Sequence, residues 1–199
     1  WKTYEKPGIL LTCCSNWRCE MLISTKHKII VLKLRDPGRV TTVIPKSKVF
    51  AHKGVEYVAV KHGVDEVKVL RNLGIKAPSP IKHYYDWPGR YKPFHAQREV
   101  ADFLTVNNRA FNLSSIGTGK TLGALWAYDY LRAAGVLNRV IVVSPLSTLE
   151  RTWADEVWQH FPHLDTSVVY GSGEKRLKML EQEADIYLIN HDGLKVDGI

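Results

Sequence analysis

The second half of the chain alternates between two patterns of apolar residues. In some segments apolar residues recur every three or four positions, as on one face of a helix, and in others they form short runs, as in a strand. Such alternation predicts an α/β fold with a doubly wound parallel sheet, whose ligand site lies at the carboxyl ends of the strands. We expect helices at 94–106, 121–134, 147–160 and 174–183, and strands at 110–113, 139–144, 166–170 and 185–190.

Three of these segments carry more specific predictions. The run 139–144 is largely apolar, which indicates burial on both faces, as in a parallel sheet. Ser147 and Glu150 have the spacing of a capping box, with Ser147 as the N-cap of the helix that runs to about residue 160. Gly135 would end the helix at 121–134.

The first half is richer in strand patterns. Residues 1–20 show no clear period, and the prolines of 77–80 (Ala-Pro-Ser-Pro) favour an extended link. We therefore divide the chain into a small strand-rich α+β domain at 1–80, a linker at 81–92 and a second domain at 93–199. Within the first domain, strands are expected at 28–35, 41–44, 48–50 and 56–60, followed by a helix at 64–73 that Gly74 would end.

Charge separates the two halves of the chain. The net charge is +8, yet residues 1–92 hold 18 Lys and Arg against 7 Asp and Glu, while residues 93–199 hold 10 against 13. A basic excess confined to one half suggests that this half meets a polyanion. Lysines scattered over a solvated β-surface would give the same count, and charge alone leaves both interpretations open.

Cysteine usage and the start of the chain bear on its location. Cys13, Cys14 and Cys19 are odd in number and have no His at ligand spacing, so neither a disulfide framework nor a zinc site is expected. Reduced thiols in the cytoplasm, or in the nucleus of a eukaryote, are the expectation.

The chain has no run of 18 apolar residues, so no membrane partner is expected. It begins with Trp1 and no signal-type core follows, so we expect a fragment that is not exported.

Residues 114–121 read Ser-Ser-Ile-Gly-Thr-Gly-Lys-Thr and give the strongest chemical signal. They lie between the expected strand at 110–113 and the expected helix at 121–134. Backbone N–H groups and the positive end of a helix dipole would converge there, which suits a phosphate. Lys120 would reach the β- and γ-phosphates, and the Thr121 hydroxyl would hold Mg²⁺.

This stretch departs from the full phosphate-loop pattern at one position. The pattern has a glycine where this chain has Ser114. Gly117, Gly119, Lys120 and Thr121 keep the positions at which backbone or side chain approaches the phosphate. The alternative is a chance Gly-Lys-Thr in a surface turn.

Residues 82–92 interleave four aromatic residues with cations. Interleaving of this kind can stack on bases and neutralise phosphates. Packing of the aromatic rings onto the next domain explains the same pattern equally well.

Further stretches resemble motifs of one family. Residues 93–97 (Pro-Phe-His-Ala-Gln) resemble the Q motif, and residues 142–149 (Val-Val-Ser-Pro-Leu-Ser-Thr-Leu), with Trp153 and Glu156 after them, resemble motif Ia. Residues 185–192 resemble a later strand and turn that touches DNA, although the family usually has Tyr in place of the His at 191. With these motifs in this order around the loop at 114–121, residues 94–194 resemble the first RecA-like domain of superfamily 2 helicases, most closely the Snf-type DNA translocases.

The resemblance implies a RecA-like P-loop fold, with ATP and Mg²⁺ as cofactors and DNA as partner. A Gln amide both donates and accepts hydrogen bonds, so Gln97 would select adenine. The residues implied for ATP are Phe94, Gln97, Gly117, Thr118, Gly119, Lys120, Thr121 and Leu122, with Lys120 and Thr121 catalytic and Thr121 the metal ligand. Those implied for DNA are Ser144, Pro145, Leu146, Ser147, Thr148, Asn190 and His191.

Hydrolysis would also need an acidic pair at the end of an apolar strand. Asp65-Glu66 precedes the loop, and Asp155-Glu156 falls within the expected helix at 147–160. We therefore expect the acidic strand beyond residue 199 in a longer protein, with a second RecA-like domain that supplies an arginine finger. The 199 residues alone should not turn over ATP.

We expect the intact protein to be an ATP-dependent DNA helicase or translocase. Two alternatives stay open: an RNA helicase or remodeller built on the same domain, and a non-catalytic nucleic-acid-binding protein whose loop only senses nucleotide. A small-molecule kinase is disfavoured, because it has no need of Gln97 or of residues 145–149.

Overall fold

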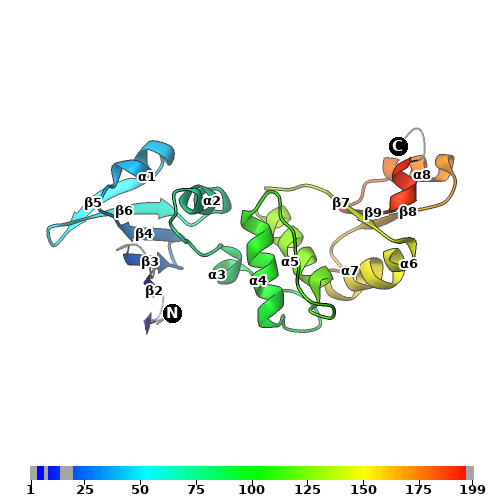
Figure 1. The fold of residues 1–199 in the computed structure, drawn as a ribbon, viewed down its shortest axis with the longest axis horizontal. Helices are drawn as coiled ribbons and strands as arrows, with labels where there is room; N and C mark the ends of the chain where they lie inside the picture. Colours follow the sequence, from blue (N-terminus) through cyan, green and yellow to red (C-terminus); the bar gives the residue numbers. More distant parts are fainter. Residues whose placement is uncertain (1–3, 7–8, 14–19, 196–199) are drawn as a thin grey trace. The chain divides into compact units, whose positions relative to one another are not determined.

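The computed structural model describes residues 4–6, 9–13 and 20–195, which belong to two compact units (Figure 1). Unit 1 comprises residues 1–85 and 106–108, and unit 2 comprises residues 86–105 and 109–199. Unit 1 has an antiparallel sheet and unit 2 a parallel one, so the chain is a mixed α/β protein. The assignment of an accessory role to residues 1–80 and of ATP binding to residues 93–199 remains a prediction.

Unit 1 is built on a six-stranded antiparallel sheet in the order β1-β2-β3-β4-β6-β5. The strands expected at 28–35, 48–50 and 56–60 are confirmed as β4, β5 and β6. The first two strands fall in the stretch that showed no clear period. The strands are β1 (Tyr4–Lys6), β2 (Ile9–Cys13), β3 (Glu20–Ser24), β4 (Ile29–Lys33), β5 (Lys48–His52) and β6 (Val55–Lys61).

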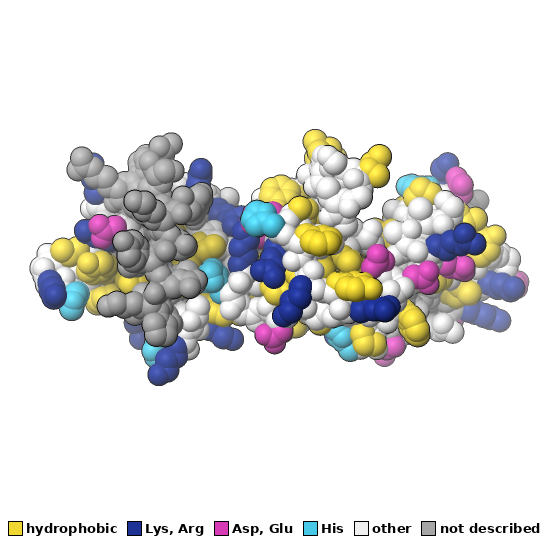
Figure 2. All heavy atoms as spheres, turned by 90° about the horizontal axis from the view of Figure 1, so that it is seen from below, with side chains coloured by type: hydrophobic (Ala, Val, Ile, Leu, Met, Phe, Trp, Pro, Cys, Tyr) yellow, Lys and Arg dark blue, Asp and Glu magenta, His cyan; other side chains and the backbone are white. Residues whose placement is uncertain are grey.

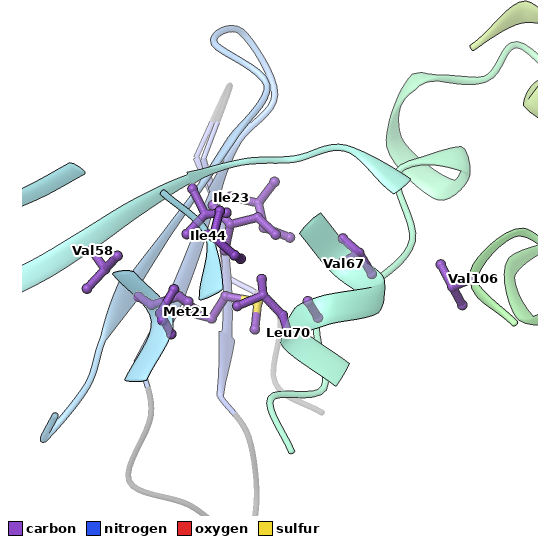
Figure 3. Close-up of a cluster of buried hydrophobic side chains, with 12 residues drawn as sticks. Met21, Ile23, Ile44, Val58, Val67, Leu70 and Val106 are labelled. Atoms are coloured by element: carbon purple, nitrogen blue, oxygen red, sulfur yellow. The ribbon is translucent and has the colours of Figure 1, made fainter. Parts of the chain in front are cut away.

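The apolar core of unit 1 lies on one face of this sheet (Figure 3). Alternate residues of β3, β4 and β6 point to this face, as the two-residue period of a strand requires. Helices α1 (Gly38–Val43) and α2 (Val64–Asn72) contribute side chains to the same cluster. The buried residues are Met21, Ile23, Ile30, Leu32, Val40, Ile44, Val58, Val60, Val67, Leu70, Ala77 and Val106.

Helix α1 occupies the place where we expected a strand at 41–44, and that expectation is wrong. The Asp36 carboxylate accepts a hydrogen bond from the Gly38 N–H at 3.0 Å at the start of the helix. Val40 and Ile44, one helical turn apart, are both buried in the core. The β-branched residues between them favour a strand, but in a strand Thr42 would share the buried face with Val40 and Ile44. Thr42 is exposed, as a helix allows.

Helix α2 ends at Gly74, as predicted. Gly74 has φ +84°, a left-handed conformation that glycine adopts without a steric cost. Its N–H donates to the Arg71 carbonyl at 2.9 Å, and the Ile75 N–H donates to the Leu70 carbonyl at 2.9 Å. These two bonds form a Schellman motif. The segment beyond this motif is partly buried, at Ala77, Ser79 and Ile81. Ile81 begins helix α3 (Ile81–Tyr84).

Unit 2 contains a three-stranded parallel sheet in the order β7-β9-β8. Strands β7 (Val140–Ser144), β8 (Thr166–Val169) and β9 (Ile186–Asn190) confirm the three later strand predictions. Helices α4 (His95–Val106), α5 (Lys120–Ala133) and α8 (Gly173–Glu181) confirm the helices expected at 94–106, 121–134 and 174–183. Gly135, with φ +71°, follows the end of α5 as predicted.

The strand expected at 110–113 is absent. These residues adopt no regular structure, and Phe111 and Leu113 are 90% and 91% exposed. A strand is stable only beside another strand that pairs its backbone groups, and none of the described strands lies beside this segment. The loop at 114–121 therefore does not follow a strand. Of the doubly wound sheet we expected, the described residues form three strands.

Strand β7 is not buried on both faces as expected. Ile141 is 62% exposed and Val143 is 39% exposed, whereas Val140 and Val142 are half-buried. Among the described strands β7 pairs with β9 alone, so it lies at an edge of the sheet. Strand β9 is the central strand and is buried at every position.

The helix expected at 147–160 occurs as three consecutive segments. They are α6 (Leu146–Thr148), the π-helix η1 (Leu149–Ala154) and α7 (Asp155–His160). The predicted capping box is wrong, because the first turn begins at Leu146 and Ser147 lies inside it. The Thr148 hydroxyl, rather than that of Ser147, donates to the Pro145 carbonyl, at 2.8 Å.

The two faces of β9 pack against different helices. Tyr187 and Ile189 belong to an apolar cluster with Val169, and Met179 and Leu180 of α8 pack against it. Ile186 and Leu188 alternate with them, point to the opposite face and are fully buried. The segment η1 contacts both β8 and β9. After β9 the chain turns through the 3₁₀ helix η2 (His191–Lys195).

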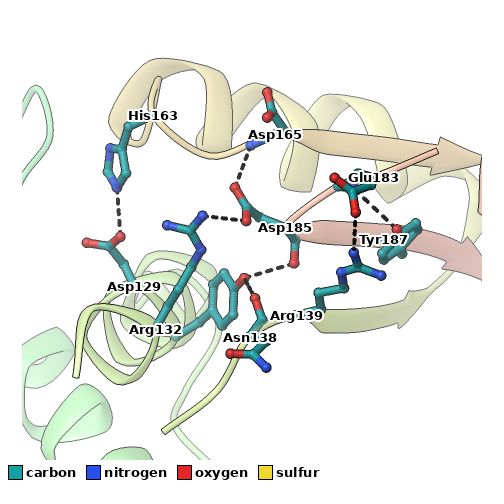
Figure 4. Close-up of polar contacts among 11 residues, drawn as sticks. Asp129, Arg132, Asn138, Arg139, His163, Asp165, Glu183, Asp185 and Tyr187 are labelled. Carbon is teal, nitrogen blue, oxygen red and sulfur yellow. Dashed lines mark hydrogen bonds and ion pairs between the residues drawn. The ribbon is translucent and has the colours of Figure 1, made fainter. Parts of the chain in front are cut away.

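A polar network fixes the second half of α5 to the start of β9 (Figure 4). The Arg132 guanidinium lies 2.6 Å from one Asp185 carboxylate oxygen, and the other oxygen accepts the Asp165 N–H at 3.0 Å. The Tyr128 hydroxyl lies within hydrogen-bond distance of the Asn138 and Asp185 carbonyls. Burial, together with the Asp185 charge, raises the pKa of Tyr128 to about 12, so it acts as a neutral donor.

None of the helices formed by the described residues combines the length and the apolar character needed to cross a membrane.

His62 is a buried titratable group of unit 1 with a strongly shifted pKa. It is 3% exposed, and its Nε2 lies 2.9 Å from the Pro78 carbonyl. A carbonyl only accepts, so Nε2 carries the proton and Nδ1 accepts from the Tyr84 hydroxyl at 2.8 Å. Burial lowers the pKa of His62 to about 4, and the nearby His83 adds to this effect, while the bond to Pro78 opposes it.

This burial predicts an acid-sensitive unit 1. Below pH 6.5 the unfolded chain binds a proton at His62 that the folded chain takes up only near pH 4, so unfolding becomes easier as the pH falls through this range. The free energy of unfolding should lose on the order of 3 kcal/mol through this group. Urea unfolding at pH 7 and pH 4 measures the loss, which His62→Gln should reduce. The exposed His52→Gln control should retain it, and equal losses in both variants would contradict the assignment.

Candidate nucleotide-binding site

The start of α5 presents two glycines in left-handed conformations. Gly119 precedes the first helical residue with φ +69° and ψ +39°, and Gly117 has φ +80°. The first N–H groups of a helix have no acceptor within the helix, and glycines in this conformation turn backbone N–H groups toward a common point. Both features favour an anion at the loop, as the sequence predicted for these positions.

The loop folds around its own lysine. The Lys120 ammonium donates to the carbonyl oxygens of Ser114 and Ser115 at 2.9 and 2.8 Å. The Thr118 hydroxyl also donates to the Ser115 carbonyl, at 2.9 Å. Lys120 therefore lies within the loop, where its charge is held by two neutral acceptors.

Gln97 of α4 lies directly against this loop. It is 5% exposed, and its Oε1 accepts the Phe94 N–H at 2.8 Å. A Cβ added to Gly119 would collide with the Gln97 amide nitrogen, so only glycine allows this approach. The structure thus brings together two predicted site residues that lie far apart in the sequence. Phe94, which precedes Gln97 in the chain, is 74% exposed.

A second glycine holds α4 and α5 in contact. A Cβ on Gly123 would lie 2.9 Å from Val100 Cγ1, closer than side chains normally approach. One turn earlier, the Gly119 carbonyl accepts the Gly123 N–H at 3.1 Å. The helices therefore meet at two glycines, and this contact sets the position of Gln97 relative to the loop.

The residues predicted to contact DNA lie at the carboxyl edge of the sheet. Ser144 and Asn190 are register partners at the ends of β7 and β9, and each is 7% exposed. The Ser144 hydroxyl lies 2.7 Å from that of Thr148. Pro145, Leu146, Ser147 and His191 are exposed around them. The structure gathers these residues at one edge, while their role in binding remains a prediction.

Two residues near these sites escaped the sequence analysis. Asn112 Oδ1 accepts the Ser114 N–H at 3.1 Å and the Ser114 hydroxyl at 2.5 Å, which orders the start of the loop. Arg176 is buried, its Nε donates to the Gly171 carbonyl at 2.8 Å, and its Nη1 lies close to Gly193. The bond from Ser114 to Asn112 is local, as in an Asx-turn, so the spacing of these two residues was a signal that could have found it. The burial of Arg176 depends on the fold and has no such signal.

The described residues offer few ligands for a metal ion at the loop. No cluster of three or more His, Cys, Asp or Glu side chains that could hold a metal occurs within the described ranges. Thr121, half-buried in the first turn of α5, offers one hydroxyl. Mg²⁺ commonly takes most of its ligands from phosphates and water, so this hydroxyl fits a metal that arrives with a nucleotide.

Both acidic pairs lie on helices, as expected. Asp65 and Glu66 are in the first turn of α2, and Asp155 and Glu156 are in the first turn of α7. Glu156 lies 3.4 Å from the imidazole of His160, one turn later. Neither pair stands at the end of a strand.

Comparison with known proteins finds distant similarity to solved structures alone. Neither the family models nor the curated proteins include a match to this chain. Among solved structures, the chain is similar to the Sulfolobus solfataricus SWI2/SNF2 ATPase core in complex with dsDNA. The identity is 24% and the TM-score 0.48, and the match covers 56% of this chain and 24% of the neighbour. This chain therefore matches about a quarter of the length of that structure.

The glycine contact makes a prediction about stability. Gly119→Ala should destabilise unit 2 more than Gly117→Ala does, because a Cβ at 119 meets Gln97 whereas a Cβ at 117 meets open space. The left-handed backbone alone should cost each variant about 1–2 kcal/mol. Adding Gln97→Ala should recover part of the loss in Gly119→Ala and none in Gly117→Ala. Urea unfolding of the four variants measures this coupling, and equal losses at 117 and 119 would show that the contact is unimportant.

Proposed function

We propose that unit 2 binds ATP with Mg²⁺ and belongs to an ATP-dependent motor that acts on DNA. The observation that supports this most directly is the approach of the Gln97 amide to a glycine loop at the N-terminus of α5. An anion site beside an adenine-selective amide suits adenine nucleotides better than free phosphate. The resemblance of residues 94–194 to superfamily 2 helicases extends this to a motor.

Within this proposal the loop residues have distinct roles. Lys120 exchanges the carbonyls of Ser114 and Ser115 for phosphate oxygens, which form stronger, charge-assisted hydrogen bonds. The backbone N–H groups of residues 117–122 surround the phosphates. Thr121 holds the metal ion, which neutralises phosphate charge when bound. Gln97 donates to and accepts from the adenine edge, and the exposed Phe94 ring covers the base.

DNA would lie along the carboxyl edge of the sheet. The hydroxyls of Ser147 and Thr148 and the polar groups of Asn190 and His191 are suited to phosphate contacts that carry no sequence information. Both acidic pairs stand on helices, so for the 199 residues themselves we propose nucleotide binding without turnover. In the motor, hydrolysis needs an acidic strand and a second RecA-like domain.

Removal of the lysine charge tests nucleotide binding. Lys120→Ala should weaken binding of ATP–Mg to this chain at least tenfold, because a charged hydrogen bond contributes about 1.5–3 kcal/mol. Isothermal titration calorimetry measures the change. Lys178→Ala, which removes an exposed lysine of α8, is the matched control and should bind as the unmodified chain does. Undiminished affinity in Lys120→Ala would refute the proposal.

Base selectivity tests the role of Gln97. Gln97→Glu keeps an acceptor for the Phe94 N–H but loses the amide donor. The ratio of ATP affinity to GTP affinity should therefore fall roughly tenfold, while the variant still binds both triphosphates. Competition of ATP and GTP for a fluorescent nucleotide gives the ratio. An unchanged ratio would remove Gln97 from base recognition and leave the phosphate site standing.

A further inference from the structure

The sheet of unit 1 has a second face, opposite to α1 and α2. Side chains alternate along each strand, so the residues between the core positions of β4 and β6 point away from the helices. We call this the outer face and define it by Val31, Lys33, Lys48, Phe50, Tyr57 and Lys61. Lys48, Phe50 and Lys61 are exposed, and Val31, Lys33 and Tyr57 are half-buried.

Two aromatic rings lie side by side on this face. Phe50 and Tyr57 are register partners of β5 and β6, with ring centroids 5.7 Å apart and planes 20° apart. Phe50 is 43% exposed, although it is a large apolar residue. A cross-strand aromatic pair contributes a little to sheet stability, about 0.2–1 kcal/mol, and that contribution does not require an open ring surface. The two rings are stacked on each other, and the exposed Phe50 ring at the end of this short stack gives an unpaired base a surface on which to continue it.

Cations surround the rings. Lys48 precedes Phe50 by two residues on the same face, and Lys61 follows Tyr57 on it by four. Lys33 forms an ion pair with Glu20 at 3.2 Å, and the two side chains are 39% and 67% exposed. Residues 20–85 together hold 13 Lys and Arg against 5 Asp and Glu. Dark-blue basic side chains are accordingly conspicuous on the described surface of unit 1 (Figure 2).

We propose that the outer face binds single-stranded DNA, with bases stacked on Phe50 and Tyr57 and phosphates opposed by Lys48 and Lys61. A flat sheet that presents aromatic rings between lysines matches the alternation of base and phosphate along a single strand. In a duplex the base faces are already stacked, so the rings would have no partner. The choice of DNA over RNA rests on the proposed function, whereas the stacking surface does not.

Aromatic substitution is the primary test. Phe50→Leu keeps an apolar side chain but removes the ring, and should weaken binding of a fluorescent oligo-dT to the full chain roughly tenfold by fluorescence anisotropy. Tyr57→Leu should do the same, and Phe50→Trp should retain the affinity. Val49→Ala is the matched control, because Val49 is 48% exposed and adjacent in β5 but points to the opposite face. Equal losses in Val49→Ala and Phe50→Leu, or no loss in Phe50→Leu, would overturn the proposal.

Salt dependence tests the lysines. Lys48→Gln should lower the slope of log affinity against log salt by about 0.7, the value for one contact to a single strand. Arg39 is an exposed cation of α1, which packs on the side of the sheet opposite to the outer face, so Arg39→Gln should leave the slope unchanged. Thermal unfolding of every variant establishes that it is folded. An unchanged slope in Lys48→Gln would contradict phosphate contact at this face.

The test also separates this face from the proposed motor. Titrations without nucleotide should give the same oligo-dT affinity for Lys178→Ala, which removes an exposed lysine of unit 2, as for the unmodified chain. If oligo-dT bound normally to Phe50→Leu but poorly to Ser147→Ala, the DNA would lie at the edge of the unit 2 sheet. The outer-face proposal would then fail, while the proposed function of unit 2 would stand. Tighter binding of oligo-U or of duplex DNA than of oligo-dT would overturn the single-stranded DNA assignment.

Discussion

The close approach of α4 and α5 determines the geometry of the candidate site. At Gly119 and Gly123 the absence of a Cβ allows Gln97 and Val100 to lie directly against the start of α5. The loop forms its own hydrogen bonds through Lys120, but those bonds do not place it relative to Gln97. Packing between the helices does so, and packed interiors tolerate very little displacement.

The opposite end of α5 is held by an ion pair and hydrogen bonds in addition to packing. Arg132 pairs with Asp185 and Tyr128 bonds to backbone at the start of β9, so the helix is fixed at both ends. Strand β9 then leads to Asn190 at the carboxyl edge of the sheet. The loop and this edge are thus joined through two rigid elements. Such a connection is one physical route by which events at a nucleotide could reach a second ligand.

The sequence predicted elements that carry their own local pattern of apolar residues. Helices α2, α4, α5 and α8 and strands β4 to β9 have clear apolar periods, and Gly74 and Gly135 mark helix ends through their conformation. The errors came from neighbours that a local pattern does not contain. Residues 110–113 have a strand-like composition but no described strand beside them, and β7 is exposed at Ile141 and Val143 for a similar reason. Residues 41–44 lie in and just after a helical turn that buries Val40 and Ile44 in the core while Thr42 between them stays exposed.

The same distinction applies to the site. The glycine loop and its lysine could be predicted, since their spacing carries the chemistry, and the family resemblance pointed to Gln97. The bonds from Lys120 to the loop carbonyls and the burial of Arg176 could not, because they depend on the folded shape of their surroundings rather than on spacing.

Strand β7 has one further implication, for the behaviour of this chain in solution. No other described strand pairs with the side of β7 away from β9, so this side offers backbone donors and acceptors to a further strand, and Ile141 and Val143 supply apolar surface beside them. Natural sheets protect such borders with charge, proline or a bulge, and the sequence Val-Ile-Val-Val has none of these. At high concentration, two copies of the chain would tend to join along this border and bury it between them.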